Sequence, residues 1–340
     1  MKNIYFLLFL LCTSCYINNS PLEEFYNLKK ISHTNIFNNQ EMIFIGGKML
    51  YFGNDSSIII QNLKSDFLLT KLNLKDKSII NLIPLGNGAN EFIHINVSQK
   101  TSDSTFIFQD MNSANLYQAN IYLGLINKIF PYKNPKCMEI AKMNNDFIAT
   151  GLFSEGMFAI YNNDTLQNYI YKYPKDNISD DKMAYKAMAY QGKLLINEEK
   201  NSILFSSYKH PYFEIFKIIN QDLISIKKSY TGNYKYEIPT DESMFFAHQY
   251  EDNTEGYIDA YATNKRIYLL YSGRSIKDID VETHEKASLS NTILVYDWEG
   301  CPIIRYNTDI DLKKICVNDA ENIIYAIAYD PNPEIVFFKL

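Results

Sequence analysis

The sequence predicts an all-β fold, a six-bladed β-propeller, and three observations carry this prediction. Along most of the 340 residues, short runs rich in β-branched and aromatic residues alternate with turn residues. The runs fall into sets of four, as expected for four-stranded antiparallel blades. The second run of successive sets starts near residues 49, 104, 146, 202, 266 and 322, a ragged repeat of about 50 residues that is typical of propeller blades.

The two ends of the chain predict how the ring closes. The last set has only three runs, whereas residues 24–31 form a strand-like run that belongs to no set. We therefore expect residues 24–31 to complete the sixth blade and to tie the two termini into one sheet. An open array of β-sandwiches is the alternative arrangement.

The N-terminus predicts export and a lipid anchor. A cationic head precedes an apolar segment, residues 4–11, that is too short to span a bilayer. Thr13-Ser14-Cys15 follows, and small residues before a cysteine resemble the lipobox of bacterial lipoproteins. We expect residues 1–14 to be a signal peptide and Cys15 to be the lipidated first residue. An ordinary signal peptide with a chance cysteine is the alternative.

This interpretation divides the mature chain into residues 15–23, a tether, and residues 24–340, one propeller domain. Tyr16, rather than Asp, after the cysteine resembles lipoproteins that are sent to the outer membrane. We therefore expect a lipid-anchored protein of the outer membrane or cell surface.

Charge and cysteine content exclude some function classes. The formal net charge of −6 is mild, with both signs interspersed, and this argues against nucleic-acid binding. The mature chain keeps Cys137, Cys301 and Cys316, which have neither metal-type spacing nor an even count. We expect these three cysteines to pack in the core as small hydrophobic side chains. A Cys301–Cys316 bridge is the alternative.

Three motifs resemble a known family. They are GNGANEF at residues 86–92, YLLYSGR at residues 268–274 and VYDWEG at residues 295–300, which opens a hairpin. They resemble the G-x-G-P-x-E-F, Y-x-x-Y-S-G-R and V-F-D-W-x-G segments of TolB-like six-bladed propeller lipoproteins of Gram-negative anaerobes. Ala89 stands where the family usually has Pro, and Tyr296 where it usually has Phe. The resemblance implies the propeller fold and a lipid anchor, and it implies no particular activity.

Long connections predict a binding face. They cover residues 75–91, 174–186, 231–255 and 272–291. The first three join one blade to the next and the last joins the second and third strands of a blade, so all four lie on the same face of a propeller. Because long loops in compact domains are usually functional or disordered, we expect this loop-rich face to bind a ligand or partner.

The segment 86–92 is the first candidate within that face. Gly86 and Gly88 would let backbone N–H groups converge beside Asn90, and Glu91 could point into the channel. The G-x-G-x-x-E spacing is not a dinucleotide fingerprint, because the third glycine and the following helix are absent. The alternative is a tight turn in which Glu91 accepts a backbone hydrogen bond and Phe92 packs between blades.

The second candidate group lies on the fifth blade. Tyr257 and Asp259 share an innermost strand and suit a sugar or peptide, although packing also explains the tyrosines. After Tyr271, Arg274 could clamp a carboxylate or sulfate at the channel mouth. A salt bridge from Arg274 to Asp259 or Glu255 is the alternative.

The leading hypothesis is a non-catalytic module that binds an envelope protein, peptide or glycan. The sequence has no H-E-x-x-H metal motif, no nucleophile elbow and no cofactor fingerprint, so we predict no catalytic residues, metal or cofactor. A metal-dependent hydrolase or lactonase with its site on the propeller axis is the alternative, and a purely structural scaffold is a third possibility.

Overall fold

The computed structural model describes residues 20–37, 46–63, 65–122, 124–132, 137–219, 222–231, 234–239, 246–275, 277, 288–329 and 332–340. Cys15 and residues 1–14, for which the sequence predicts a signal peptide, lie outside the described residues. None of the helices within these ranges has the length and apolar character needed to span a bilayer.

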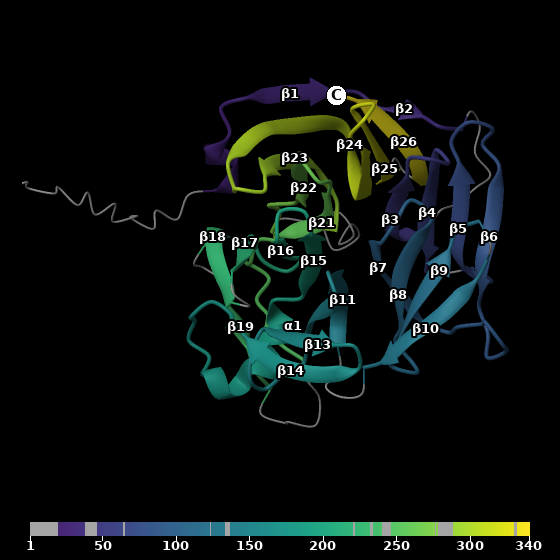
Figure 1. Ribbon diagram of the computed structural model, residues 1–340. Helices are drawn as coiled ribbons and strands as arrows, with labels where there is room; N and C mark the ends of the chain where they lie inside the picture. The colour runs from purple at the N-terminus through teal and green to yellow at the C-terminus, as the bar shows by residue number, and fades with distance from the viewer. Residues whose placement is uncertain are drawn as a thin grey trace, which may run out of the picture.

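The structure is a β-propeller whose four-stranded antiparallel blades surround a central axis (Figure 1). Four blades are separate sheets. Their strands are β3 (Gly46–Phe52), β4 (Ser57–Asn62), β5 (Phe67–Asn73) and β6 (Ile79–Pro84) in blade 1; β7 (Ile95–Lys100), β8 (Thr105–Asp110), β9 (Asn115–Asn120) and β10 (Ile126–Pro131) in blade 2; β11 (Cys137–Met143), β12 (Asp146–Gly151), β13 (Phe158–Asn162) and β14 (Thr165–Ile170) in blade 3; and β15 (Gly192–Asn197), β16 (Ser202–Ser207), β17 (Tyr212–Ile219) and β18 (Asp222–Tyr230) in blade 4.

Blades 5 and 6 are joined by one long strand. This strand, β24 (Pro302–Asn318), pairs with β23 through its first part and with β25 through its second part. It is therefore the outermost strand of blade 5 and then the innermost strand of blade 6, and Figure 1 shows it arching between the two. The other strands are β21 (Tyr257–Ala262), β22 (Arg266–Tyr271) and β23 (Ser290–Asp297) in blade 5, and β25 (Ile323–Tyr329) and β26 (Pro333–Lys339) in blade 6.

The N-terminal segment closes the ring, but not with the residues that the sequence suggested. Strand β2 (Thr34–Asn35) pairs antiparallel with β26 and is the fourth strand of blade 6. Strand β1 (Leu28–Ile31) instead runs parallel to Arg305–Thr308 of β24. The prediction for residues 24–31 was thus wrong in its partner, because the chain first covers the exposed edge that β24 presents in blade 5 and only then reaches blade 6.

Among the described residues, the hydrophobic core forms six clusters, each between two neighbouring blades. The cluster between blades 3 and 4 contains Met157, Phe158, Phe205 and Phe216, for example. The cluster between blades 6 and 1 joins Ile327 and Ile335 to Ile58 and Ile60, and this contact completes the ring. Each blade therefore buries both faces against its neighbours, as a radial arrangement requires.

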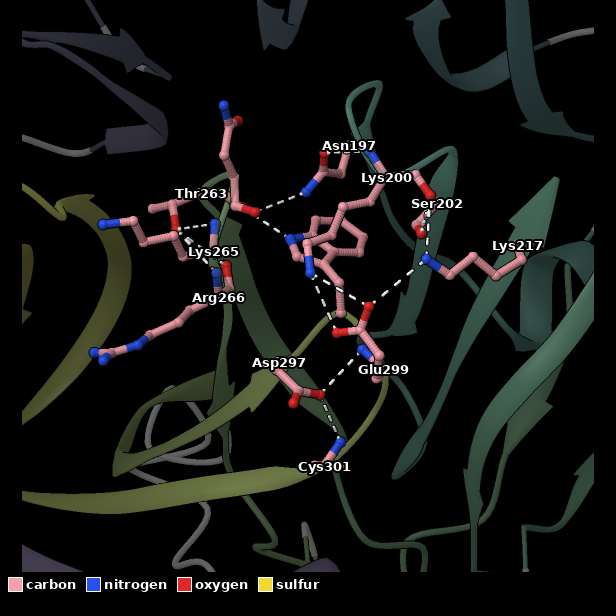
Figure 2. Close-up of polar contacts among 12 residues, drawn as sticks. Asn197, Lys200, Ser202, Lys217, Thr263, Lys265, Arg266, Asp297, Glu299 and Cys301 are labelled. Atoms are coloured by element: carbon pink, nitrogen blue, oxygen red, sulfur yellow. Dashed lines mark hydrogen bonds and ion pairs between the residues drawn. The ribbon is translucent and has the colours of Figure 1, made fainter.

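The D-W-x-G hairpin fixes blade 5 to blade 4. Asp297 Oδ1 accepts hydrogen bonds from the N–H groups of Glu299 (3.0 Å) and Cys301 (2.8 Å), and Gly300 supplies the positive φ of the turn (+83°). Trp298 is fully buried and its indole N–H donates to the carbonyl of Thr263 (2.8 Å). Figure 2 shows how Glu299 meets lysines of blade 4 beside this turn.

Cys301 and Cys316 are in no disulfide, so the alternative Cys301–Cys316 bridge is not formed. Cys301 is exposed at the outer hairpin, whereas Cys316 is buried on the innermost part of β24. Cys301 immediately precedes β24 and Cys316 lies near its end, so the length of the strand separates them. The expectation of buried cysteines is confirmed for Cys137 and Cys316 and wrong for Cys301.

Candidate functional site

The propeller axis is surrounded by a ring of polar side chains to which every blade contributes one residue near the start of its innermost strand. We call this set the axial ring. Its members, in blade order, are Lys48, Asn96, Glu139, Lys193, Asp259 and Lys314.

Contacts between members cross the boundaries between blades. Lys48 Nζ donates to both oxygens of Glu139 (2.8 and 2.6 Å), to which Asn96 Nδ2 also donates (3.3 Å). On the other side, Lys193 Nζ donates to Asp259 Oδ1 (2.7 Å), and Lys314 Nζ lies 3.9 Å from the same oxygen. The axis is thus filled by charged groups rather than by apolar side chains.

Four members of the ring are buried and two, Asn96 and Lys314, are half-buried, and burial sets the electrostatics of the ring. Burial lowers the pKa of Lys48 in spite of the neighbouring Glu139, and Lys193 adds to the lowering. Burial likewise lowers the pKa of Lys314, against the attraction of Asp259. Burial alone would raise the pKa of Asp259, which is 1 % exposed, but Lys193 and Lys314 hold it below its usual value. Neighbouring groups therefore neutralise the positive charges of Lys48 and Lys314 less fully than the negative charge of Asp259.

A hollow of about 600 Å³ opens from the ring along the axis. We call it the axial mouth. Its floor includes Lys48 and Lys193, and its walls are the last residues of innermost strands and the short turns that follow them, such as 100–103 and 261–264. The axial mouth therefore opens on the face opposite to the long connections.

The glycine-rich segment that the sequence singled out is a local turn. Glu91 is exposed, and its carboxylate accepts a hydrogen bond from the N–H of Gly88 (2.8 Å). A Cβ atom at Gly86 would overlap that carboxylate, and Asn90 has a φ of +61°. Phe92 packs in the cluster between blades 1 and 2. This is the geometry that we gave as the alternative, and Glu91 does not point into the channel.

The candidate residues of blade 5 do not form one site. Asp259 belongs to the axial ring. Tyr257 and Tyr271 pack in the cluster between blades 4 and 5, with ring centroids 5.5 Å apart. A register shift between Tyr257 and Asp259 separates the tyrosine from the axis.

Arg274 forms a bidentate pair with a carboxylate that the sequence analysis did not consider. Its guanidinium donates to both oxygens of Asp311 (3.0 and 2.6 Å), at the start of the blade 6 part of β24. The predicted partners Asp259 and Glu255 are not its partners in these contacts. The fork of the arginine therefore holds the loop after β22 against blade 6.

The long connections of blade 4 build an aromatic cluster on the loop-rich face. Residues 174–191 contain a 3-10 helix (Asp180–Lys182) and α1 (Met183–Ala189), and a short ladder of β19 (Tyr236–Glu237) and β20 (His248–Gln249) follows the blade. Tyr236 donates to Asp176 Oδ2 (2.7 Å), and the fully buried Lys186 contacts Asp176 Oδ1 (2.9 Å). A hollow of about 380 Å³ lies beside these groups. The Tyr236 hydroxyl and the Lys186 ammonium group therefore both have the Asp176 carboxylate as an internal partner.

The sequence of this chain matches one family model, described as TolB-like 6-blade propeller-like, over residues 25–320. The chain belongs to this family. The TolB-like match spans the axial ring and ends two residues after the last strand that contributes to it. No curated protein matches the sequence.

Solved structures similar to this TolB-like chain share its fold at low identity. A protein of Bacteroides fragilis NCTC 9343 described as exported has 11% identity and a TM-score of 0.55, with 92% of this chain and 98% of that chain covered. Regucalcin of Agrobacterium tumefaciens strain C58, described as a calcium-binding protein, has 10% identity and a TM-score of 0.52, with 92% and 95% covered. At such identities the likeness shows the fold alone.

The axial ring of this chain does not suit a divalent cation. Each of its two carboxylates, Glu139 and Asp259, already has a lysine ammonium group within hydrogen-bond distance. Within the described ranges, no three or more His, Cys, Asp or Glu side chains are grouped as metal ligands. A cation such as Ca²⁺ takes six to eight oxygen ligands, and here lysine nitrogen atoms stand where such ligands would converge.

Sequence reasoning found one member of the axial ring, Asp259, and missed the others. The available signal was a charged or amide residue at the same place in successive repeats. Lys48 in GGKML and Glu139 in CMEIA, for example, interrupt strand segments that are otherwise free of charge. Comparing repeats position by position would have aligned them.

Proposed function

We propose that this TolB-like propeller is an exported, lipid-anchored recognition module that binds a small polar ligand in the axial mouth without transforming it. The observation that carries the proposal is the axial mouth itself: a hollow of about 600 Å³ on the axis, floored by buried charged side chains. Its size lies in the range of ordinary small-molecule sites. The N-terminal sequence supports export and the anchor at Cys15.

The contacts of the axial ring favour binding over metal-dependent hydrolysis. A channel-centred hydrolase or lactonase needs carboxylate and amide groups that are free to hold a cation. Glu139 and Asp259 are instead held by Lys48 and Lys193. The loop-rich face offers a second hollow, but its tyrosine hydroxyl groups are largely directed to internal partners. Binding of an envelope protein, peptide or glycan at the loop-rich face stays a prediction.

A mouth-blocking variant tests the proposal. Asn264 is exposed at the turn after β21 and lines the axial mouth, so Asn264→Trp should fill the hollow without disturbing the core. The full-length protein, purified in detergent from its own membranes, should carry a bound low-mass species in native mass spectra. Asn264→Trp should lose that species. Asn112→Trp, on an exposed turn on the other face, should keep it.

Two outcomes would contradict the proposal. One is a wild-type protein that stays empty after incubation with an envelope extract. The other is metal-dependent turnover of a lactone or ester panel, which would establish the hydrolase alternative. Lipidation is tested separately: wild-type protein should gain the mass of a diacylglyceryl-cysteine terminus, and Cys15→Ser should not.

A further inference from the structure

The floor of the axial mouth carries an unbalanced charge. The axial ring has three ammonium groups (Lys48, Lys193, Lys314) and two carboxylates (Glu139, Asp259), which leaves one positive charge in excess. Lys48 and Lys193 line the mouth and are 8 % and 4 % exposed. Lys193 donates a hydrogen bond to the carboxylate of Asp259, and an ammonium group has three N–H donors. These lysines can therefore donate hydrogen bonds to an acceptor group of a ligand that enters the mouth.

The pKa shifts of the ring agree with this arrangement. Burial lowers the pKa of both Lys48 and Lys314, so their positive charges lack full compensation. The pKa of Asp259 is lowered because two lysines outweigh its burial. A further negative charge near the lysines would relieve the imbalance.

The walls of the axial mouth are rich in hydroxyl and amide groups. Ser98 is 5 % exposed, and its Oγ has no hydrogen-bond partner among the described residues. The Tyr261 hydroxyl accepts a hydrogen bond from the N–H of Tyr51 (3.4 Å), so its own O–H is available as a donor. Further lining side chains of this kind are Gln99, Thr101, Ser102, Thr263 and Asn264.

Among the described residues that line the axial mouth, the acidic side chains are Asp103 and Asp319, and both lie at its rim. Asp103 is paired with Lys100 (2.9 Å). Asp319 accepts hydrogen bonds from Thr263 (2.8 Å) and Tyr268 (3.1 Å). A ligand with one negative charge could place it beside the lysines at the inner end of the mouth. A second negative charge on the same ligand would lie near Asp319 at the outer end, where it would be repelled.

We infer that the axial mouth binds a small hydroxylated monoacid, such as a sugar acid, with its carboxylate at Lys48 and Lys193 and its hydroxyl groups along the Ser98 wall. The inference rests on the proposed function, since it names the class of ligand for the same site. A hydrogen bond to a charged partner contributes roughly 1.5–3 kcal/mol, which corresponds to a tenfold or larger change in affinity.

Matched sugars test the class of ligand. Calorimetric titrations of the full-length protein in detergent should show that D-glucuronate binds at least about tenfold more tightly than D-glucose, which differs in lacking the carboxylate. Glucarate, with a second carboxylate, should bind more weakly than glucuronate. If no acidic sugar binds, the inference is overturned.

Paired lysine variants locate the charge that matters. Lys193→Met should reduce affinity for glucuronate about tenfold or more and leave glucose binding unchanged. Lys193→Arg should retain most of the affinity, which separates charge from loss of folding. Lys100→Met removes the same charge at the rim and should change the affinity by less than about threefold.

The failure of this inference differs from the failure of the proposed function. Equal binding of glucose and glucuronate, abolished by Asn264→Trp, would reject the acidic ligand and keep the axial mouth as a site. Equal loss of affinity in Lys193→Met and Lys100→Met would also reject the inner-end placement. Binding that persists in Asn264→Trp would reject the axial mouth itself.

Discussion

Two clusters at the boundary of blade 5 contain the same chemical groups in opposite surroundings. In the axial ring, Asp259 meets Lys193 (2.7 Å) and Lys314 (3.9 Å). At the outer hairpin, Glu299 meets Lys200 (3.2 Å) and Lys217 (3.7 Å), as Figure 2 shows. Both clusters therefore hold one carboxylate between two lysines, and both reach residues of blade 4.

Exposure separates the two clusters. The side chain of Asp259 is 1% exposed, whereas that of Glu299 is 52% exposed. Water and salt screen the outer pair, so its contribution to stability is small. The inner groups have left water, so each charge depends on its protein partners. Burial therefore makes the inner cluster sensitive to any added or removed charge, which is a property that a binding site needs and a surface contact lacks.

The largest expected effect is from Asp259→Asn. The substitution leaves the buried Lys193 and the half-buried Lys314 with no carboxylate between them, and it weakens the acceptor for the N–H of Ile315 (3.0 Å). We expect the free energy of unfolding to fall by about 3–5 kcal/mol, as for other broken buried pairs. Urea unfolding followed by circular dichroism measures this. The double variant Asp259→Asn/Lys193→Met should recover part of the loss. A loss below about 1 kcal/mol would show that the axial ring is solvated like the outer cluster.

A smaller effect should appear as a pH dependence of stability. The folded-state pKa values of Lys48 and Lys314 are lowered from 10.5, so the unfolded chain binds more protons between the lowered values and 10.5. The two lysines therefore contribute a rise of stability with pH across that window, by up to about 1.4 kcal/mol per pH unit for each lysine that is deprotonated in the folded state. Buried groups such as Cys137 and Tyr190 contribute in the opposite direction, because burial raises their folded-state pKa values and the unfolded chain loses those protons first.

Thermal unfolding of the wild type and of Lys314→Met between pH 7 and 10.5 isolates the lysine contribution, because the two proteins share the opposing cysteine and tyrosine contributions. The stability of the wild type relative to Lys314→Met should increase as the pH rises, because the variant lacks one of the shifted groups. Lys200→Met, in the outer cluster, should keep a constant difference from the wild type. A difference between the wild type and Lys314→Met that does not change with pH would contradict the lowered pKa of Lys314.

Local features of the molecule were predictable from the sequence, and contacts across the axis were not. The strand sets, the D-W-x-G hairpin and the turn at Gly86–Glu91 depend on residues that are close in the chain. Lys48 and Glu139 are separated by 91 positions, and only the closed ring brings them together. The partner of Arg274 was missed for the same reason, because Asp311 reaches it through the turn of β24 into blade 6.

The motif that was easiest to recognise in the sequence was thus not the feature that says most about function. The VYDWEG motif stands out because its turn, its buried tryptophan and its backbone contacts all require particular residues. The axial ring is spread as single residues over six repeats, so no local pattern marks it. Repeated positions, rather than continuous motifs, are the place to look for sites in a radial fold.

The smallest expected effect belongs to the outer cluster. Glu299→Gln keeps the shape of the side chain, removes its charge and leaves Lys200 and Lys217 free to be solvated. We expect the free energy of unfolding to fall by less than about 1 kcal/mol, and the difference from wild type to vanish in roughly 1 M salt. Urea unfolding at low and high salt measures both. A loss as large as that of Asp259→Asn would mean that the hairpin contact, and not burial at the axis, determines how blades 4 and 5 are held together.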